Sequence, residues 1–225
     1  MNPTPYAGPD QSLGSLAVQI PGATAVFRRL KLDFCCGGQQ SLAQACASRQ
    51  LDLDAVLEEI RGLQNREAAP AAPAPGDLID HILARYHEVH RQQLPELIRM
   101  ARRVEAVHRD HPQVPRGLSS HLEVMEQELL EHMAKEEQIL FPMLRQGGHP
   151  MVAHPIGVMR HEHVSHGAQL ERLAAITSQH QPPEGACNTW RALYAGTAAL
   201  VEDLMAHIHL ENNLLFPAFE GAARH

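Results

Sequence analysis

Two short segments of the sequence repeat a pattern of residues that can bind a metal ion. The segments HMAKEEQILFPML (132–144) and HIHLENNLLFPAF (207–219) align without gaps, and each holds a His, a Glu four places later, and then Leu-Phe-Pro. Positions i and i+4 lie on one face of an α-helix, so each segment presents an imidazole and a carboxylate together. The repeat predicts two ligand pairs: His132 with Glu136, and His207 with Glu211.

Apolar residues around the two pairs indicate the direction in which the pairs point. At helical spacing, four apolar residues fall on the side of each pair: Met125, Leu129, Ile139 and Met143 for the first, and Leu200, Leu204, Leu214 and Ala218 for the second. Both pairs are therefore expected to face a core, where two carboxylates repel each other unless a cation lies between them. A single His-x-x-x-Glu pair would suit an ordinary hydrogen-bonded pair. Two such pairs, each followed by Leu-Phe-Pro, favour a metal site.

The histidines offer more candidate ligands than such a site needs. All 16 lie at or after His81, which itself falls off the apolar face. His163 shares a face with apolar residues and His166 is the alternative, whereas His161 points almost oppositely; His87 and His90 lie only about 60° apart, so periodicity does not separate them. The remaining histidines are expected in loops, at the terminus or facing solvent: His108, His111, His121, His149, His154, His180, His209 and His225.

The elements that carry these residues are predicted to be helices. Strand signals are nearly absent, and four long periodic stretches cover 77–108, 117–145, 155–180 and 187–219. They are separated by short polar segments at 110–117, 146–150 and 181–185. Four helices of this length with short connections predict an all-α, up-down four-helix bundle.

The first part of the chain has a different chemistry. It has no histidine before residue 81 but three of the four cysteines, and short helices are expected at 12–20, 22–32, 41–49 and 52–64, with Ser12, Ser41 and Asp52 as N-caps. The Ala/Pro segment AAPAAPAPG reads as a semi-rigid linker. We therefore predict a small helical, cysteine-bearing domain at 1–66, a linker at 67–76 and a bundle at 77–225.

Cys35 and Cys36 are adjacent in the Gly-rich turn DFCCGG. They can be two small residues that fill a tight turn, or a functional thiol pair. Thiols in such a turn before a helix N-terminus are expected to be partly exposed, with a lowered pKa. Cys46 and Cys187 are expected to be packing residues.

Composition limits the function classes. The chain has 225 residues and a net charge of −7, so it lacks the clustered positive charge that a nucleic-acid binder needs. Its start shows no basic run followed by an apolar stretch, and no apolar window is long enough to span a membrane. Four cysteines, two of them adjacent, do not form a disulfide framework, so a cytoplasmic location is expected.

Four imidazoles and two carboxylates in a bundle core are the ligand set of a dinuclear site, and mixed His/carboxylate ligation suits iron. If Glu136 and Glu211 bridge, each metal has two imidazoles, two carboxylate oxygens and one shared oxo or hydroxo group. That makes five ligands where an octahedral ion takes about six, so one position stays open. Glu128 and Asp203, each four residues before a ligand His, are either edge charges or carboxylates that orient the ligands.

The bundle is similar to a hemerythrin-like domain, and the whole chain resembles the Repair of Iron Centres (RIC) di-iron family of the ScdA/YtfE type. LGSLAVQIPGATAVFRRLKLDFCCGGQQSLAQA resembles that family's short N-terminal domain, and RYHEVHRQQLPEL, HMAKEEQILFPM and HIHLENNLLFP resemble its bundle. The resemblance implies terminal ligands His87, His132, His163 and His207, bridges Glu136 and Glu211, and roles near the metal for Glu128 and Glu162. Where the family often has Glu-Ser-Glu-His, this chain has Met-Arg-His-Glu-His, with the extra His161.

The resemblance implies a protein that repairs iron–sulfur clusters damaged by nitrosative or oxidative stress. It would donate labile iron to damaged iron–sulfur clients, with Cys35 and Cys36 contacting iron, a redox partner or a client, and the same open site suits reduction of nitric oxide to nitrous oxide. The alternative is a hemerythrin-like oxygen or nitric-oxide binding or sensing protein. The N-terminal domain is small and would be only marginally stable by itself. We therefore expect it to dock on a partner chain or on the bundle, and we predict a homodimer. The sequence lacks the repeated Glu-x-x-His motif expected of a ferritin-like oxidase, and it lacks the His-Glu-x-x-His motif of a zincin.

Overall fold

The computed structural model describes residues 7–64, 73–148 and 151–220, and the regular elements of this part of the chain are all helices, with no β-strand. The described residues form two compact units: one combines the short N-terminal helices with Ile208–Ala218, and the other contains Pro75–His207 and the residues from Phe219 onward. The all-α prediction is confirmed. Within these same residues, no helix has both the length and the apolarity to cross a membrane.

The N-terminal unit contains four short helices: α1 (Leu13–Gln19), α2 (Ala23–Arg29), α3 (Leu42–Ser48) and α4 (Leu53–Gln64). The predicted caps act at their starts. Ser12 Oγ accepts a hydrogen bond from the Ser15 amide, and Ser41 forms a reciprocal capping box with Gln44. Asp52 Oδ1 accepts from the Asp54 amide. These bonds satisfy amide groups that a helix start leaves without a partner, which explains why the helices begin there.

A close backbone approach holds α1 against the turn that bears Cys35 and Cys36. The amide of Gly14 donates to the carbonyl of Gly38 at 2.8 Å. A Cβ on Gly38 would lie 2.5 Å from the carbonyl oxygen of Phe34, so only glycine fits there. The Gly-rich sequence after the cysteines is therefore required by the fold of the turn.

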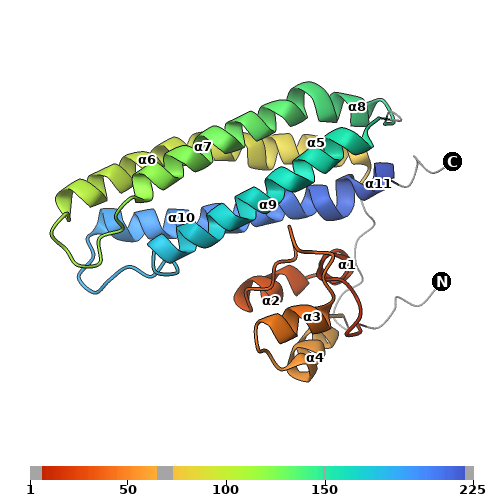
Figure 1. Ribbon diagram of the computed structural model, residues 1–225, viewed down its shortest axis with the longest axis horizontal. Coiled ribbons are helices and arrows are strands. Elements are labelled where there is room, and N and C mark those ends of the chain that lie inside the picture. Colours follow the sequence, from red (N-terminus) through yellow and green to blue (C-terminus); the bar gives the residue numbers. More distant parts are fainter. Residues whose placement is uncertain (1–6, 65–72, 149–150, 221–225) are drawn as a thin grey trace. The chain divides into compact units, whose positions relative to one another are not determined.

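The second unit contains most of the bundle (Figure 1), in which the long helices run alongside one another, and the last helix of the bundle continues into Ile208–Ala218. Three of the four predicted helices consist of consecutive elements: α5 (Pro75–Ile82), η1 (Leu83–His87) and α6 (Glu88–Val107); α7 (Leu118–Lys135), η2 (Glu136–Leu140) and α8 (Phe141–Arg145); and α10 (Asn188–Leu210), η3 (Glu211–Leu215) and α11 (Pro217–Glu220). The third helix, α9 (Ala153–Ile176), is continuous. Together they confirm the predicted four-helix bundle.

The elements η1, η2 and η3 are π-helical turns, in which a backbone amide bonds to the carbonyl five residues earlier. The amide of Phe141 bonds to the carbonyl of Glu136, and the amide of Phe216 to that of Glu211. Proline follows directly in both cases, at Pro142 and Pro217. Proline has no N–H, and its ring clashes with the carbonyl four residues back. Proline thus follows the widened turn in both copies and fits it, although η1 forms the same kind of turn without a proline.

The π turns correct one part of the sequence interpretation. Ile139 was expected to share the buried face of His132 and Glu136, but it is 55% exposed and Met143 is only half-buried, whereas Leu140 and Leu144 are buried. The second copy shows the same displacement: Leu214 is half-buried and Ala218 exposed, and the buried residues are Leu215 and Phe219. A π turn contains one more residue than an α turn, so every residue after it moves one place along the face. Before the turns, Met125, Leu129, Leu200 and Leu204 are buried as predicted.

Two histidines that were expected in loops or facing solvent are buried instead. His121 is buried on α7, where its Nε2 lies 3.0 Å from the carbonyl oxygen of Gln169, and His209 is buried near the end of α10. Each has a hydrogen-bond partner that lowers the cost of burying its ring, the Gln169 carbonyl for His121 and the Asn213 side chain for His209, so the prediction for them was wrong. His149 and His225 fall outside the described residues.

The predicted domain limits remain a prediction. Residues 67–72, most of the expected linker 67–76, lie outside the described residues, and α5 already begins at Pro75, which is inside the predicted linker. Proline at a helix start is favourable because its missing N–H would have had no helical partner there.

Candidate metal centre

The six predicted ligands are all buried in the bundle, although every one of them is polar. They form two groups, in each of which one ligand atom from every residue lies within 4.8 Å of the others: His87, Glu136, His207 and Glu211; and His132, Glu136, His163 and Glu211. Each group has two imidazoles of its own, and both carboxylates belong to both groups. This is the arrangement expected of two neighbouring cations that share two carboxylates.

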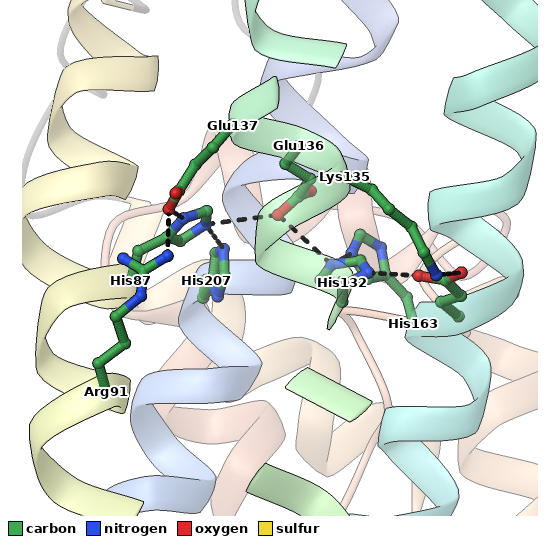
Figure 2. Close-up of polar contacts among 9 residues, drawn as sticks. His87, Arg91, His132, Lys135, Glu136, Glu137, His163 and His207 are labelled. Carbon is green, nitrogen blue, oxygen red and sulfur yellow. Dashed lines mark hydrogen bonds and ion pairs between the residues drawn. The ribbon is translucent and has the colours of Figure 1, made fainter. Parts of the chain in front are cut away.

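Glu136 lies between the two pairs of imidazoles (Figure 2). Its Oε2 atom is 3.4 Å from Nε2 of His87, which belongs to one group, and 3.5 Å from Nε2 of His132, which belongs to the other. Glu136 is the first residue of η2, so the π turn begins at the shared carboxylate. Glu211 holds the equivalent place as the first residue of η3, four residues after His207.

The spacing of the imidazoles suits a metal ion. Nε2 of His87 lies 3.2 Å from Nε2 of His207, and Nε2 of His163 lies 3.2 Å from Nε2 of His132. Two nitrogens that each bind a metal at about 2.05 Å, with an angle between 90° and 109°, are about 2.9–3.3 Å apart. The described residues therefore fit two metal ions with mixed nitrogen and oxygen ligation.

A carboxylate on the far side of the ring orients one imidazole in each group. Nδ1 of His87 donates to Oε1 of Glu137 at 2.7 Å, and the same oxygen accepts from Arg91 at 2.6 Å. A donating Nδ1 leaves the lone pair on Nε2, the atom that faces the metal position. The carboxylate thus selects the tautomer that can bind a cation.

The second group repeats this arrangement. Nδ1 of His132 donates to Oε2 of Glu162 at 2.8 Å, and Lys135 donates to the other oxygen at 2.6 Å (Figure 2). The hydrogen bond from His132 lowers the pKa of Glu162 to about 2, with Lys135 adding to the effect. For Glu137, burial alone would raise the pKa, but hydrogen bonds from His87 and Arg91 outweigh it and lower the pKa. Both carboxylates are therefore ionised near neutral pH.

The structure distinguishes the histidines that periodicity left open. His87 and His163 are in the ligand groups, His161 is exposed, and His90 and His166 are buried next to the groups. The ring of His90 lies 5.5 Å from that of His207, and the ring of His166 lies 5.0 Å from that of His132. Burial, with a contribution from neighbouring imidazoles, lowers the pKa of His166 to about 3.

Glu128 and Asp203 do not contact the ligand imidazoles. Glu128 is exposed and accepts a hydrogen bond from Gln169, and Asp203 forms a bidentate ion pair with Arg85. The interpretation of these two residues as charges at the bundle edge fits their contacts. The carboxylates that do contact a candidate ligand imidazole are Glu162, for which the resemblance implied a role near the metal, and Glu137, which was missed although it directly follows Glu136.

Cys35 and Cys36 differ from the prediction in part. Cys36 is partly exposed as expected, but Cys35 is buried. A hydrogen bond with Cys36, whose sulfur is 3.5 Å away, and burial raise the pKa of Cys35 well above its ordinary value, so the expected lowered pKa was wrong for this thiol. The turn is closed by Asp33, which accepts from the amides of Cys35, Cys36 and Gly37. Its carboxylate and the two thiols are also close enough together to hold a cation.

The remaining cysteines behave as packing residues to different degrees. Cys46 is buried in α3, as expected. Cys187 is half-buried, and its sulfur lies 3.2 Å from Nε2 of His108.

Four long helices around two His/carboxylate groups with shared carboxylates define a hemerythrin-like metal-binding protein. The sequence matches the hemerythrin HHE cation binding domain over residues 78–219, and a domain of unknown function, DUF542, over residues 9–64. The chain is 51% identical over 211 residues to the "Iron-sulfur cluster repair protein YtfE" of Pectobacterium atrosepticum, covering 92% of this chain and 96% of that protein. The protein of the same name in Musicola paradisiaca is 51% identical over 218 residues, covering 95% and 98%. The chain belongs to the hemerythrin-like family of these YtfE proteins.

Proposed function

We propose that this protein repairs damaged iron–sulfur clusters by supplying iron from a di-iron centre. Two observations support the proposal. The relatives that match nearly the whole chain are named as iron–sulfur cluster repair proteins. The two ligand groups share both carboxylates and contain only two imidazoles each, which leaves each ion with fewer protein ligands than an octahedral ion takes.

The second observation carries the mechanism. Iron bound here would bring a redox-active Lewis acid with an exchangeable coordination position. His87 and His207 would hold one ion and His132 and His163 the other, with Glu136 and Glu211 available to both. A proton on either shared carboxylate would neutralise an anionic ligand of both positions, so protonation would favour release of iron while the helices keep their places.

The residues around the centre have proposed roles that follow from their contacts. Glu162 orients His132 and is placed, with Lys135, to receive a proton from the ligand shell. Glu128, one turn before His132 at the exposed side of α7, is proposed to assist proton movement to solvent. Cys36, which is partly exposed, and Cys35 beside it would receive the departing iron or contact the client.

The partners follow from the same chemistry. Clients are proteins with damaged iron–sulfur clusters in the cytoplasm, and nitric oxide or oxygen are the small ligands for the open positions. Reduction of nitric oxide to nitrous oxide at the reduced pair is a second reaction that the open positions allow. We further propose a homodimer, and a monomeric mass by light scattering at micromolar concentration would contradict it.

Transfer of iron tests the proposal directly. The reduced, iron-loaded protein is mixed with an apo-ferredoxin and a sulfide source, with a chelator as the competing acceptor in a parallel sample, and cluster formation is followed by visible absorption. Glu136→Gln should hold little iron and rebuild no cluster, whereas His161→Ala, on the exposed side of α9, should match the wild type. Iron that stays on the protein in both samples would eliminate donation and favour a carrier or sensor of oxygen or nitric oxide.

A further inference from the structure

A third imidazole lies beside the pair formed by His132 and His163. His166 is three residues after His163 on α9, so it lies on nearly the same face of that helix, and it is only 3% exposed. Its ring centroid is 5.0 Å from that of His132, with the two ring planes at 84°. The ligand group of His132 and His163 does not include it.

The Nε2 atom of His166 is buried and has no hydrogen-bond partner among the described residues. A buried polar atom without a partner destabilises a fold, because it has lost its hydrogen bonds to water and gained none. A leucine of similar size would fill this position at no such cost. The partner of this nitrogen is therefore to be sought outside the protein chain.

The position of His166 indicates what that partner is. It lies next to a metal position at which the protein supplies two imidazoles and two shared carboxylates. We infer that His166 donates a hydrogen bond through Nε2 to a small ligand, such as a short anion or a diatomic molecule, at the open position of the ion held by His132 and His163. His166 is in this sense a positioning residue, and the inference rests on the proposed dinuclear site. His90 has the corresponding place beside His207, but the inference concerns His166 alone.

Azide is a suitable probe because it is a short anion that binds ferric iron and changes its visible absorption. The iron-loaded, oxidised protein is titrated with sodium azide, and bound iron per chain is measured on the same samples. His166→Leu removes the hydrogen bond and keeps the volume, whereas His166→Gln keeps a donor. His161→Leu is the matched control, because it changes an exposed histidine of the same helix.

The expected result is an unchanged iron content in all variants. The azide Kd of His166→Leu should rise about tenfold, as expected for one lost hydrogen bond to a charged ligand. His166→Gln should recover most of the affinity, and His161→Leu should equal the wild type. In the metal-free protein, His166→Leu should melt at a higher temperature than the wild type, because it removes a buried atom without a partner.

The outcomes separate the two proposals. If the wild type holds no iron, the dinuclear site itself is refuted, and this inference with it. If the wild type binds iron and azide and His166→Leu binds both equally well, only the role of His166 is overturned. Loss of iron from a folded His166→Leu protein would also overturn it, since His166 would then be a ligand.

Discussion

Glu137 contacts the same imidazole as its chain neighbour Glu136, but from the opposite ring nitrogen. Oε2 of Glu136 lies 3.4 Å from Nε2 of His87, and Oε1 of Glu137 lies 2.7 Å from Nδ1. Glu136 and Glu137 are the first two residues of η2, so their side chains leave the helix in different directions. The two carboxylates therefore enclose one ring, the first on its metal-facing side and the second on the side that sets its tautomer.

Replacing Glu136 by Gln should remove both ions, because this carboxylate belongs to both ligand groups. Iron content should fall from about two per chain to well below one. The metal-free variant should unfold at a higher urea concentration than the metal-free wild type, since a buried charge has been removed. Metal analysis and urea unfolding measure the two effects, and a variant that retains both ions would contradict the bridging role.

Replacing Glu162 by Gln should weaken the binding of the ion held by His132 more than that of the other ion. Loss of a carboxylate that orients a ligand imidazole typically lowers metal affinity about 10–100-fold. Competition with a chelator should therefore show one ion released early and the second at the wild-type rate. Glu128→Gln, which changes a carboxylate with no contact to a ligand imidazole, is the control for iron affinity. Equal retention of both ions in Glu162→Gln would show that the hydrogen bond to His132 is dispensable.

Replacing Pro142 by Ala should allow an ordinary α turn after Glu136, because residue 142 regains an N–H and loses the ring. The residues after Glu136 would then shift by one position around the helix relative to it. Glu136 and the buried residues after it could no longer all keep their places, so iron affinity should fall. Pro95→Ala is the control, because Pro95 lies inside α6 away from the π turns. Iron content and hydrogen exchange over 136–145 measure the change. If the two variants behave identically, Pro142 is not needed to maintain the π turn.

The two thiols of the turn should react at different rates. Cys36 is partly exposed, whereas Cys35 is buried and has a raised pKa, and the thiolate is the reactive form. Labelling with a thiol reagent at pH 7.5 should modify Cys36 quickly and Cys35 slowly, as read by mass spectrometry of the peptides. Cys36→Ser should lose the fast phase while keeping its iron, and a fast reaction at Cys35 in that variant would contradict the buried position.

Acid should destabilise the protein partly through His121. Burial lowers the pKa of this imidazole in the folded state, with the nearby Arg172 contributing and the hydrogen bond to the Gln169 carbonyl opposing. As pH falls below about 6.5, the unfolded chain binds a proton that the folded chain binds less readily, so the free energy of unfolding decreases until the folded pKa is passed. Urea unfolding from pH 7 to pH 5 should show a smaller decrease for His121→Gln than for the wild type. If the stability of His121→Gln decreases with falling pH as much as that of the wild type, the acid sensitivity comes from other groups.

The sequence predicted the bundle, and the candidate ligands that it singled out lie together in the structure, but periodicity was a reliable guide only where the helices are α-helical. Met125, Leu129, Leu200 and Leu204 precede the π turns and are buried as expected, whereas Ile139 and Ala218 follow them and are exposed. Hydrogen-bond register is not visible in a pattern of apolar residues, although the repeated proline was a signal for it. Glu137 was missed for a related reason: at α-helical spacing it points away from Glu136. His90 and His166 could not be separated from ligands by periodicity, since three residues along a helix change its direction by only about 60°.

Each π turn is equivalent to a single residue inserted into a regular helix. Deleting Ile139 and Leu214 together would remove one residue from η2 and one from η3, and would bring the apolar residues before and after each of these two turns into one continuous α-helical stripe. Such a shortened chain should form a more regular helical bundle, whose core is filled by side chains instead of metal ions. The candidate ligands thus lie at irregularities of three helices, with His87 at the end of η1 and Glu136 and Glu211 at the starts of η2 and η3, so the site depends on the course of these helices as well as on the ligand residues.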